Sequence, residues 1–155
     1  MADDREIRAE VREIVEIAEI NDAEYRSWLT RGEVRMQACA DCGTFRHPAR
    51  WLCPECLSER WTWERVAGRG IVETFVWYME PFDGRFPDVP YNVAVVQLTE
   101  GPRVITNVMG VKFGDLEVGQ EVGAVIINGP QHVPLLNFFL SNSVPGRQPR
   151  TTPSG

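Results

Sequence analysis

The residues of this chain that could do chemistry are concentrated in one short stretch, which holds all four cysteines. They form two C-x-x-C pairs separated by ten residues: Cys39, Cys42, Cys53 and Cys56. Four thiolates at this spacing are typical of a tetrahedral zinc site that joins two turns. A site with four protein ligands has no open position for water or substrate, so the zinc is expected to stabilise the fold and not to catalyse. A ferredoxin-like or rubredoxin-like iron site and a disulfide or redox role are the alternatives.

The two cysteine pairs differ in the residue that follows them. Gly43 follows the first pair, where such a turn often needs a positive φ angle, whereas Leu57 follows the second. The second turn is therefore the less typical zinc knuckle of the two.

The rest of the sequence favours a reducing compartment for these thiols. The stretch MADDREIRAEV is charged where a secretory signal would be apolar, and no run approaches the roughly 18 apolar residues of a membrane span. We therefore expect a cytoplasmic protein that is not membrane-bound. In the cytoplasm stable disulfides are rare, and C-x-x-C pairs commonly bind metal.

Catalytic residues are not evident outside the cysteine pairs. The chain has two histidines, His47 and His132, and no nucleophile elbow, phosphate loop or dinucleotide fingerprint. Because every cysteine is assigned to the metal, nucleophilic catalysis would need a hydroxyl group with His132 as its base. The sequence thus predicts no catalytic residue, with acid–base chemistry by the scattered carboxylates as the open alternative.

Helices are predicted to precede the cysteine stretch. Apolar residues recur every three or four positions over 4–20, which predicts an amphipathic helix. Residues 1–24 carry nine acids and three arginines, so the net charge of −6 lies there. This helix could be a solvated surface or a docking helix for a partner subunit. A second short helix begins at Asn21 or Asp22 and ends at Gly32, with its aromatic side expected to cover the cysteine ribbon.

Short strands are predicted to follow. Five or so β-branched or aromatic runs are punctuated by glycine and proline, with no crossover helix between them. This pattern predicts a small Greek-key barrel. The stretch VPLLNFFL at 133–140 is either a last core strand or an apolar contact surface. The chain then divides into a helical segment, a ribbon, a barrel and a disordered tail, at 1–32, 33–66, 67–143 and 144–155.

Two groups of residues are candidates for contact with a ligand or partner. A basic cluster lies in and beside the cysteine stretch, and two phenylalanines lie in the proline-rich loop 77–91: Arg35, Arg46, His47, Arg50, Phe82 and Phe86. The cations could meet phosphates or acidic side chains, and the phenylalanines could pack on a partner. The plainer interpretations are local charge balance on a solvated surface and a loop that folds back over the barrel.

The order of these parts resembles a known family. YRSWLTRGEV, CADCGTFRHPARWLCPEC, GRGIVETF, PYNVAVVQLTEGPRV and LEVGQEV resemble the zinc-ribbon plus OB-fold proteins associated with acyl-CoA metabolism, long described as a domain of unknown function. The resemblance covers about residues 22–140. It implies a mainly β fold with N-terminal helices, a rubredoxin-like zinc ribbon and a small five-stranded OB-fold barrel. Leu57 departs from it, since glycine is frequent there.

The resemblance also implies a function. Members of this family look like non-catalytic accessory subunits of a thiolase-fold enzyme. That enzyme is a thiolase, a synthase or an aldolase, and it acts on acyl-CoA thioesters. Some are fused to a hydratase-like domain in steroid side-chain degradation, where the partner performs a retro-aldol cleavage. The implied partners are therefore a thiolase-fold protein and acyl-CoA, with structural Zn²⁺ as the cofactor.

Nucleic-acid binding is the rival function, because OB-folds and zinc ribbons both serve it and the tryptophans could stack on bases. The net charge of −6 opposes the electrostatic attraction that supplies most non-specific affinity for nucleic acid. We therefore expect no nucleic-acid partner. An electron carrier of the rubredoxin type is the third class, and it would be coloured where a zinc protein is colourless.

Overall fold

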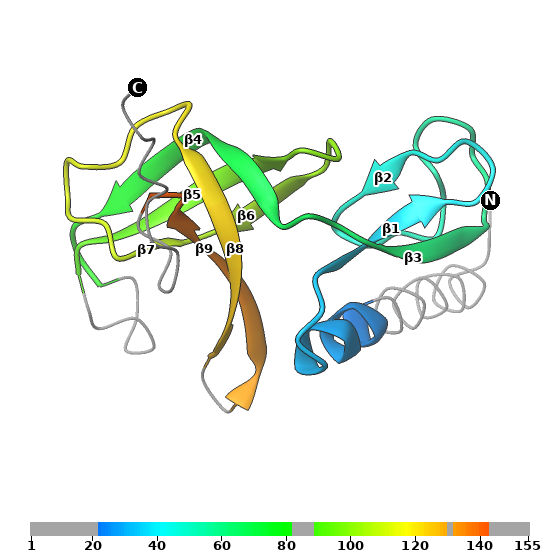
Figure 1. Cartoon of the computed structure of the whole chain (residues 1–155), viewed down its shortest axis with the longest axis horizontal. Helices are drawn as coiled ribbons and strands as arrows, with labels where there is room; N and C mark the ends of the chain where they lie inside the picture. The colour runs from blue at the N-terminus through cyan, green and yellow to red at the C-terminus, as the bar shows by residue number, and fades with distance from the viewer. Residues whose placement is uncertain (1–21, 82–88, 130–131, 143–155) are drawn as a thin grey trace, which may run out of the picture. The chain divides into compact units, whose positions relative to one another are not determined.

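The computed structural model describes residues 22–81, 89–129 and 132–142 (Figure 1). The predicted first helix, the tail from residue 144, and both loop phenylalanines, Phe82 and Phe86, lie outside the described residues. What is described is mainly β, as the sequence predicts. None of its helices is long and apolar enough to span a membrane.

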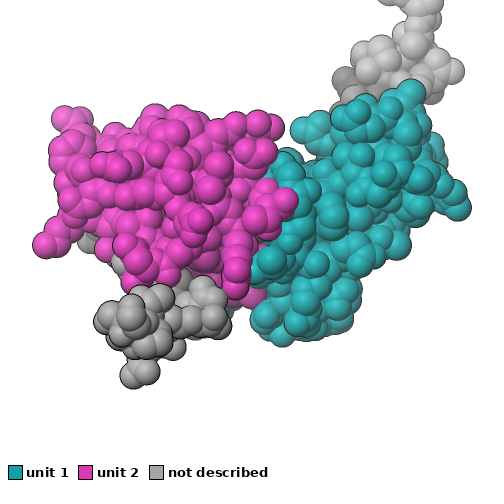
Figure 2. Space-filling view, turned by 45° about the horizontal axis from the view of Figure 1, so that its top comes forward, with its two compact units in different colours: residues 1–67, 100–102, 128–135 teal, residues 68–99, 103–127, 136–155 magenta. Residues whose placement is uncertain are grey.

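The chain divides into two compact units, which Figure 2 shows in different colours. The ribbon unit comprises residues 1–67, 100–102 and 128–135, and the sheet unit comprises residues 68–99, 103–127 and 136–155. Each unit is described by itself below.

A helix at 22–30 opens the described part of the ribbon unit. It ends where Gly32 takes a positive φ angle of 75° and its N–H donates to the carbonyl of Leu29 at 2.9 Å. Glycine is the residue that adopts this conformation without steric strain, so the helix ends where the sequence predicts. Leu29 is buried, while most of the helix is exposed.

In the part of the ribbon unit that the structure describes, three short strands form the sheet: β1 (Arg35–Cys39), β2 (Phe45–Arg46) and β3 (Trp61–Arg65). The order is β2-β1-β3, and both pairs are antiparallel. β1 is central, so its side chains are buried on both faces, with Met36 and Gln37 each 0% exposed. This strand carries the first cysteine at its end and thereby anchors the first turn.

Within the described residues, six strands form the sheet of the sheet unit: β4 (Arg69–Tyr78), β5 (Tyr91–Leu98), β6 (Arg103–Thr106), β7 (Val108–Met109), β8 (Glu121–Asn128) and β9 (Pro134–Leu140). Their order is β6-β5-β4-β8-β9-β7. Burial alternates strictly along β5, as expected for a strand with one face on the core. VPLLNFFL is a core strand, β9, in which Phe138 is 0% exposed.

The predicted five-stranded barrel needs two corrections. The run RVITNVM forms two strands, β6 and β7, separated by the single residue Asn107. These strands stand at opposite ends of the order, and within the described residues no ladder pairs them. Hydrogen bonding therefore does not close this sheet into a complete ring.

The cause of the break is a buried amide on a neighbouring strand. Asn92 of β5 is 5% exposed, and its side chain donates to the carbonyl of Val108 and accepts from the N–H of Val108, both at 2.8 Å. Asn107 in turn donates its side-chain N–H to the carbonyl of Asn92. These bonds satisfy the backbone where a ladder would otherwise run, so the chain can bend there without leaving buried polar groups unpaired.

Candidate metal centre

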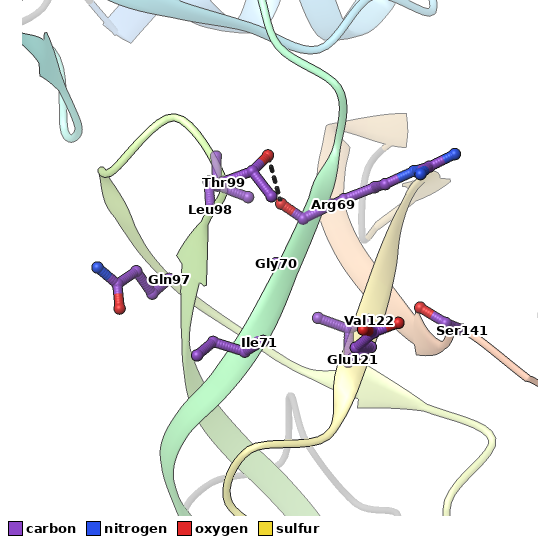
Figure 3. A pocket seen from close by; sticks show the side chains of 9 residues that line it. All are labelled: Arg69, Gly70, Ile71, Gln97, Leu98, Thr99, Glu121, Val122 and Ser141. Atoms are coloured by element: carbon purple, nitrogen blue, oxygen red, sulfur yellow. Dashed lines mark hydrogen bonds between the residues drawn. The ribbon is translucent and has the colours of Figure 1, made fainter.

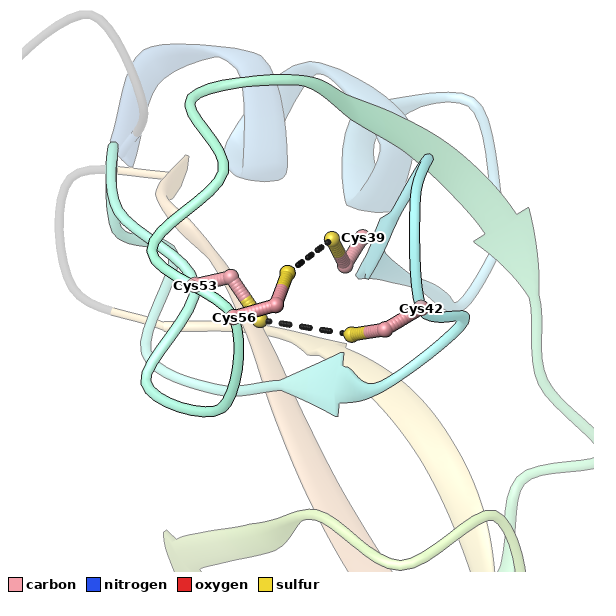
Figure 4. A group of neighbouring side chains, drawn as sticks. All are labelled: Cys39, Cys42, Cys53 and Cys56. Atoms are coloured by element: carbon pink, nitrogen blue, oxygen red, sulfur yellow. Dashed lines mark hydrogen bonds between the residues drawn. The ribbon is translucent and has the colours of Figure 1, made fainter.

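The two C-x-x-C turns of the ribbon unit repeat one backbone pattern. The N–H of Gly43 donates to the carbonyl of Cys39 at 2.9 Å, and the N–H of Leu57 donates to the carbonyl of Cys53 at 3.0 Å. In return, Cys39 N–H donates to Thr44 and Cys53 N–H to Ser58, each at 2.9 Å. Both turns therefore present their cysteines in the same way, and Figure 4 shows the four side chains converging from the two loops.

The sulfur atoms are close enough to share one metal ion. All four Sγ atoms lie within 4.8 Å of one another, and the Cys39–Cys56 and Cys42–Cys53 Sγ pairs are each 3.6 Å apart. A tetrahedral zinc with Zn–S bonds of about 2.3 Å separates its sulfurs by roughly 3.8 Å. The donor set and its spacing therefore fit Zn²⁺. Cys39 and Cys53 are buried, and Cys42 and Cys56 are exposed.

The thiols already differ in acidity through their local hydrogen bonds. The backbone N–H of Cys42 is the largest influence that lowers the pKa of Cys39 to about 7, and hydrogen bonding to Thr44 lowers the pKa of Cys42. The backbone N–H of Ser58 lowers the pKa of Cys56, but partial desolvation of its sulfur and the three neighbouring thiols together raise it to about 12. Neighbouring thiolates repel one another, and a bound divalent cation removes that penalty by favouring the deprotonated form of each ligand.

Polar contacts outside the cysteines join the two turns. Asp41, in the first turn, accepts hydrogen bonds from Ser58 Oγ and from the guanidinium of Arg60, which follow the second turn. The carbonyl of Arg60 also accepts from the N–H of Ala40 at 3.1 Å. These contacts hold the turns at a common spacing. Sequence reasoning missed them, although Asp41 and Ser58 each lie within two residues of a ligand.

Only part of the predicted basic cluster is exposed at the surface. Arg35 is half-buried; its guanidinium donates to Glu33 at 2.7 Å and to the Trp63 carbonyl at 2.9 Å, and it lies 4.4 Å from the ring centre of Trp28. Arg50 is exposed, and its backbone N–H donates to Gln37. Arg35 is therefore engaged within the unit, and Arg50 is the exposed cation of the cluster.

Arg46 is buried instead of exposed, at 5%. Its Nε donates to the side-chain oxygen of Gln37 at 2.7 Å, and its guanidinium lies 5.9 Å from the ring centre of Trp61. Its two terminal nitrogens are buried without a hydrogen-bond partner among the described residues. A buried cation stabilises a fold only where its donors are paired, so these nitrogens have unused capacity for an acceptor.

His47 is half-buried and joins the helix to the ribbon. Its ring centre lies 5.1 Å from that of Tyr25, which is 6.4 Å from that of Trp63. Trp63 Nε1–H donates to Glu24 of the same helix at 2.7 Å. Burial lowers the pKa of His47 and raises that of Tyr25 to about 12. The prediction that the aromatic side of the helix covers the ribbon is therefore confirmed.

A separate cavity of about 460 Å³ lies in the sheet unit (Figure 3). Arg69, Gly70 and Ile71 of β4 contribute to its lining, together with the end of β5 and the start of β8. The Thr99 hydroxyl donates to the Arg69 carbonyl at 3.4 Å, and Glu121 adds a carboxylate. Sequence reasoning did not find this cavity, because its residues come from strands that pair only in the folded sheet.

The comparisons with known proteins agree with this architecture. The model described as the ChsH2 rubredoxin-like zinc ribbon domain matches residues 29–62, and that of the ChsH2 C-terminal OB-fold domain matches residues 63–126. A solved structure, the Ltp2-ChsH2(DUF35) aldolase, is 32% identical with a TM-score of 0.71, over 77% of this chain and 93% of that chain. This chain belongs to the ChsH2 family. The predicted resemblance is thus confirmed, and with it the zinc ribbon and the OB-fold.

Other relatives match a smaller part of their own length. A probable enoyl-CoA hydratase alpha subunit of Thermomonospora curvata is 40% identical over 87 residues, which are 56% of this chain and 27% of that protein. A DUF35 domain-containing scaffold protein of Methanothermobacter thermautotrophicus is 35% identical over 89 residues, which are 56% of this chain and 66% of that protein. This ChsH2-family chain thus spans about a quarter of the first and about two thirds of the second.

The family and the geometry together give this chain a structural zinc ribbon with a four-cysteine metal-binding group. Zn²⁺ bound there would neutralise the crowded thiolates and fix the two turns. This leaves the zinc no coordination position for a substrate.

Substitution of one buried thiol tests the metal site. Cys39→Ser should reduce the zinc content from about one ion per chain towards zero and unfold the ribbon unit, because structural zinc sites supply roughly 10–16 kcal/mol of binding free energy at neutral pH. Metal analysis and near-ultraviolet circular dichroism of the tryptophans measure both effects. Ala40→Ser, an exposed change in the same turn, is the matched control. Unchanged zinc content in Cys39→Ser would refute the four-ligand site.

The half-buried His47 gives a second prediction. Because the pKa of His47 is lower in the fold than the ordinary value near 6.5, the unfolded chain binds more protons between these two values. The stability that neutral His47 contributes is complete above about pH 6.5 and is lost as the pH falls below it. The free energy of unfolding should therefore decrease from pH 7 to 5, and less steeply in His47→Gln than in the parent.

Urea unfolding at several pH values, with zinc in excess, measures this slope. Acid also weakens zinc binding, so the informative quantity is the difference between variants and not the slope itself. His132→Gln, at the other histidine, which is exposed, is the matched control. Equal slopes for His47→Gln and the parent would contradict a contribution of His47 to the pH dependence of stability.

Proposed function

We propose that this chain is a non-catalytic accessory subunit that assembles with a thiolase-fold enzyme acting on acyl-CoA. The observation that carries the proposal is its match to the Ltp2-ChsH2(DUF35) aldolase, which extends over 93% of that chain. Since that complex is named an aldolase, we propose retro-aldol cleavage as the reaction of the assembly. The first substrate to test is a CoA thioester of a steroid side chain. Thiolase and synthase reactions are the alternatives to retro-aldol cleavage.

The chemistry of the chain supports a non-catalytic role. Its cysteines form a closed metal-binding group, so neither a thiolate nucleophile nor an open zinc position is left. Nucleophilic catalysis needs a hydroxyl within hydrogen-bond reach of a base. Among the described residues, neither His47 nor His132 makes such a bond. The catalytic groups are therefore assigned to the partner enzyme.

The outer face of the sheet unit supports a protein contact. Cross-strand pairs place Thr74, Val95 and Ile105 in one row across β4, β5 and β6, and Val76 opposite Val93 in the next row. Ile105 is 76% exposed and Val76 is 56% exposed. Where β4 ends and β5 begins, Tyr78 stacks on Tyr91 with ring centres 4.9 Å apart. Contiguous exposed apolar residues on a sheet mark an interaction surface more often than isolated ones do.

Two features of this chain could contribute to acyl-CoA binding in the assembly. Arg50 is an exposed cation that can meet a phosphate, as can Arg46 if its unpaired nitrogens become accessible. The cavity in the sheet unit has a volume suited to a small organic group and carries both Arg69 and Glu121. We assign CoA binding to the assembly and not to this chain alone. Arg35, His47, Phe82 and Phe86 stay candidates for CoA or partner contact.

The first test is co-purification of the tagged chain with the thiolase-fold protein encoded nearest to its gene, followed by acyl-CoA cleavage and condensation assays. We expect a stable complex whose activity requires both chains, because the partner supplies the catalytic groups. Activity of the purified chain alone at the rate of the complex would contradict the non-catalytic role. Two separate proteins with no effect on each other's activity would contradict the assembly. Nucleic acid or a different protein would then be the partner to test.

A surface variant then tests where the enzyme binds. Ile105→Lys should weaken the complex at least tenfold, because a charge replaces an exposed apolar side chain that the contact would bury. Val118→Lys is the matched control, since Val118 is 65% exposed but lies in the loop before β8, outside the three strands. Calorimetric titration measures both affinities. Equal weakening by the two variants would indicate a general charge effect and not a contact at β6.

A further inference from the structure

In the second zinc knuckle, Leu57 adopts a backbone conformation that is unfavourable for leucine. In each C-x-x-C turn, the residue after the second cysteine adopts a positive φ angle: 74° at Gly43 and 60° at Leu57. Both N–H groups make the same hydrogen bond to the first cysteine of their turn. The two positions are therefore structurally equivalent. One is occupied by glycine and the other by leucine, whose β-carbon makes a positive φ angle unfavourable.

Packing does not explain the leucine. The Leu57 side chain is 71% exposed, so it adds little to the core of the ribbon unit. At the equivalent position, a β-carbon built on Gly43 would meet nothing within 4 Å, so this kind of turn does not need a side chain to fill space. A strained backbone that carries an exposed apolar side chain is better explained by a function outside the fold.

The residues beside Leu57 indicate the chemistry of its binding partner. Glu55 and Glu59 flank it two positions away on either side, and both are exposed without an ion pair among the described residues. A two-fold contact between copies of this chain, centred on Leu57, would bring these carboxylates against their counterparts, and like charges at an interface are unfavourable. A different protein with basic residues around an apolar pocket fits better.

We propose that Leu57 is an anchor by which the second zinc knuckle docks into a basic-rimmed apolar pocket of the partner enzyme. This inference rests on the proposed function, because it takes the partner from there. The knuckle is suited to the task, since zinc binding and the Asp41–Ser58 contact fix its backbone before the partner arrives. A backbone that is fixed in advance loses little conformational freedom on binding.

The substitution Leu57→Gly separates folding from binding. Glycine adopts the positive φ angle without strain, so the variant should retain zinc and unfold at a temperature higher by about 2–4 °C. Its affinity for the co-purified thiolase-fold subunit should nevertheless fall at least tenfold, because the anchor is lost. Leu57→Met, which keeps an apolar side chain of similar volume, should bind within about threefold of the parent.

Gly43→Leu is the matched control in the first knuckle. It places the same side chain in the equivalent strained position, so it should lower the unfolding temperature without improving binding. Thermal unfolding, metal analysis and calorimetric titration with the purified subunit give all the readouts on intact chains. The opposite signs of the stability changes in Leu57→Gly and Gly43→Leu would establish that strain, and not local packing, distinguishes the two positions.

Several outcomes would overturn the inference. Parental affinity in Leu57→Gly would show that no anchor is present, and loss of zinc in that variant would show that the leucine is structural. A parental dimer that Leu57→Gly converts to a monomer, with enzyme binding unchanged, would make a second copy the occupant. If the parent itself does not bind the thiolase-fold subunit, the proposed function fails and this inference, which needs that partner, fails with it.

Discussion

The ribbon unit depends on the meeting of four sulfur atoms at one point. Its described elements are a helix at 22–30 and three strands of five residues or fewer, too little to bury a large apolar core. Its buried apolar residues are few, and two of them are the cysteines Cys39 and Cys53. Because the metal ligands are themselves part of this core, zinc binding and folding are one process here. The Asp41 contacts and the Tyr25–His47–Trp63 packing add to this arrangement but could not replace it.

The sheet unit is held together by a different interaction. Alternating valines of β4, β5 and β8 fill its core, with Val72, Val96 and Val122 all 0% exposed. One polar requirement of its core is met by Asn92, whose amide satisfies the backbone at Val108 where β6 gives way to β7. An apolar residue there would leave a buried N–H and carbonyl without partners, at about 1–3 kcal/mol for each group. The same chain thus combines a metal-dependent unit with one that rests on apolar burial.

These two kinds of stabilisation explain what the sequence could predict. Metal ligands and alternating strands are local patterns, so Cys39, Cys42, Cys53 and Cys56 and the strand β5 were predictable from spacing alone. Asn107 was not, because the bend there depends on Asn92 of another strand. The basic cluster was predicted as a surface, but Gln37 on the adjacent strand buries Arg46, and Glu33 and Trp63 engage Arg35. Charge can be counted along a sequence, whereas its exposure depends on which residues the register places opposite it.

A closed metal group restricts how such a chain can act. Four thiols that face one another leave the zinc no position for a ligand, so the metal can affect another molecule only through the surface that it shapes. The two knuckles share one backbone pattern, yet Leu57 keeps a left-handed conformation that is roughly 1–2 kcal/mol unfavourable for a residue with a β-carbon. The ribbon unit has a small apolar core, so a strain of this size is a large fraction of its stability. This conformation lies next to the metal ligand Cys56, so a bound metal would hold the backbone that presents the exposed Leu57 side chain.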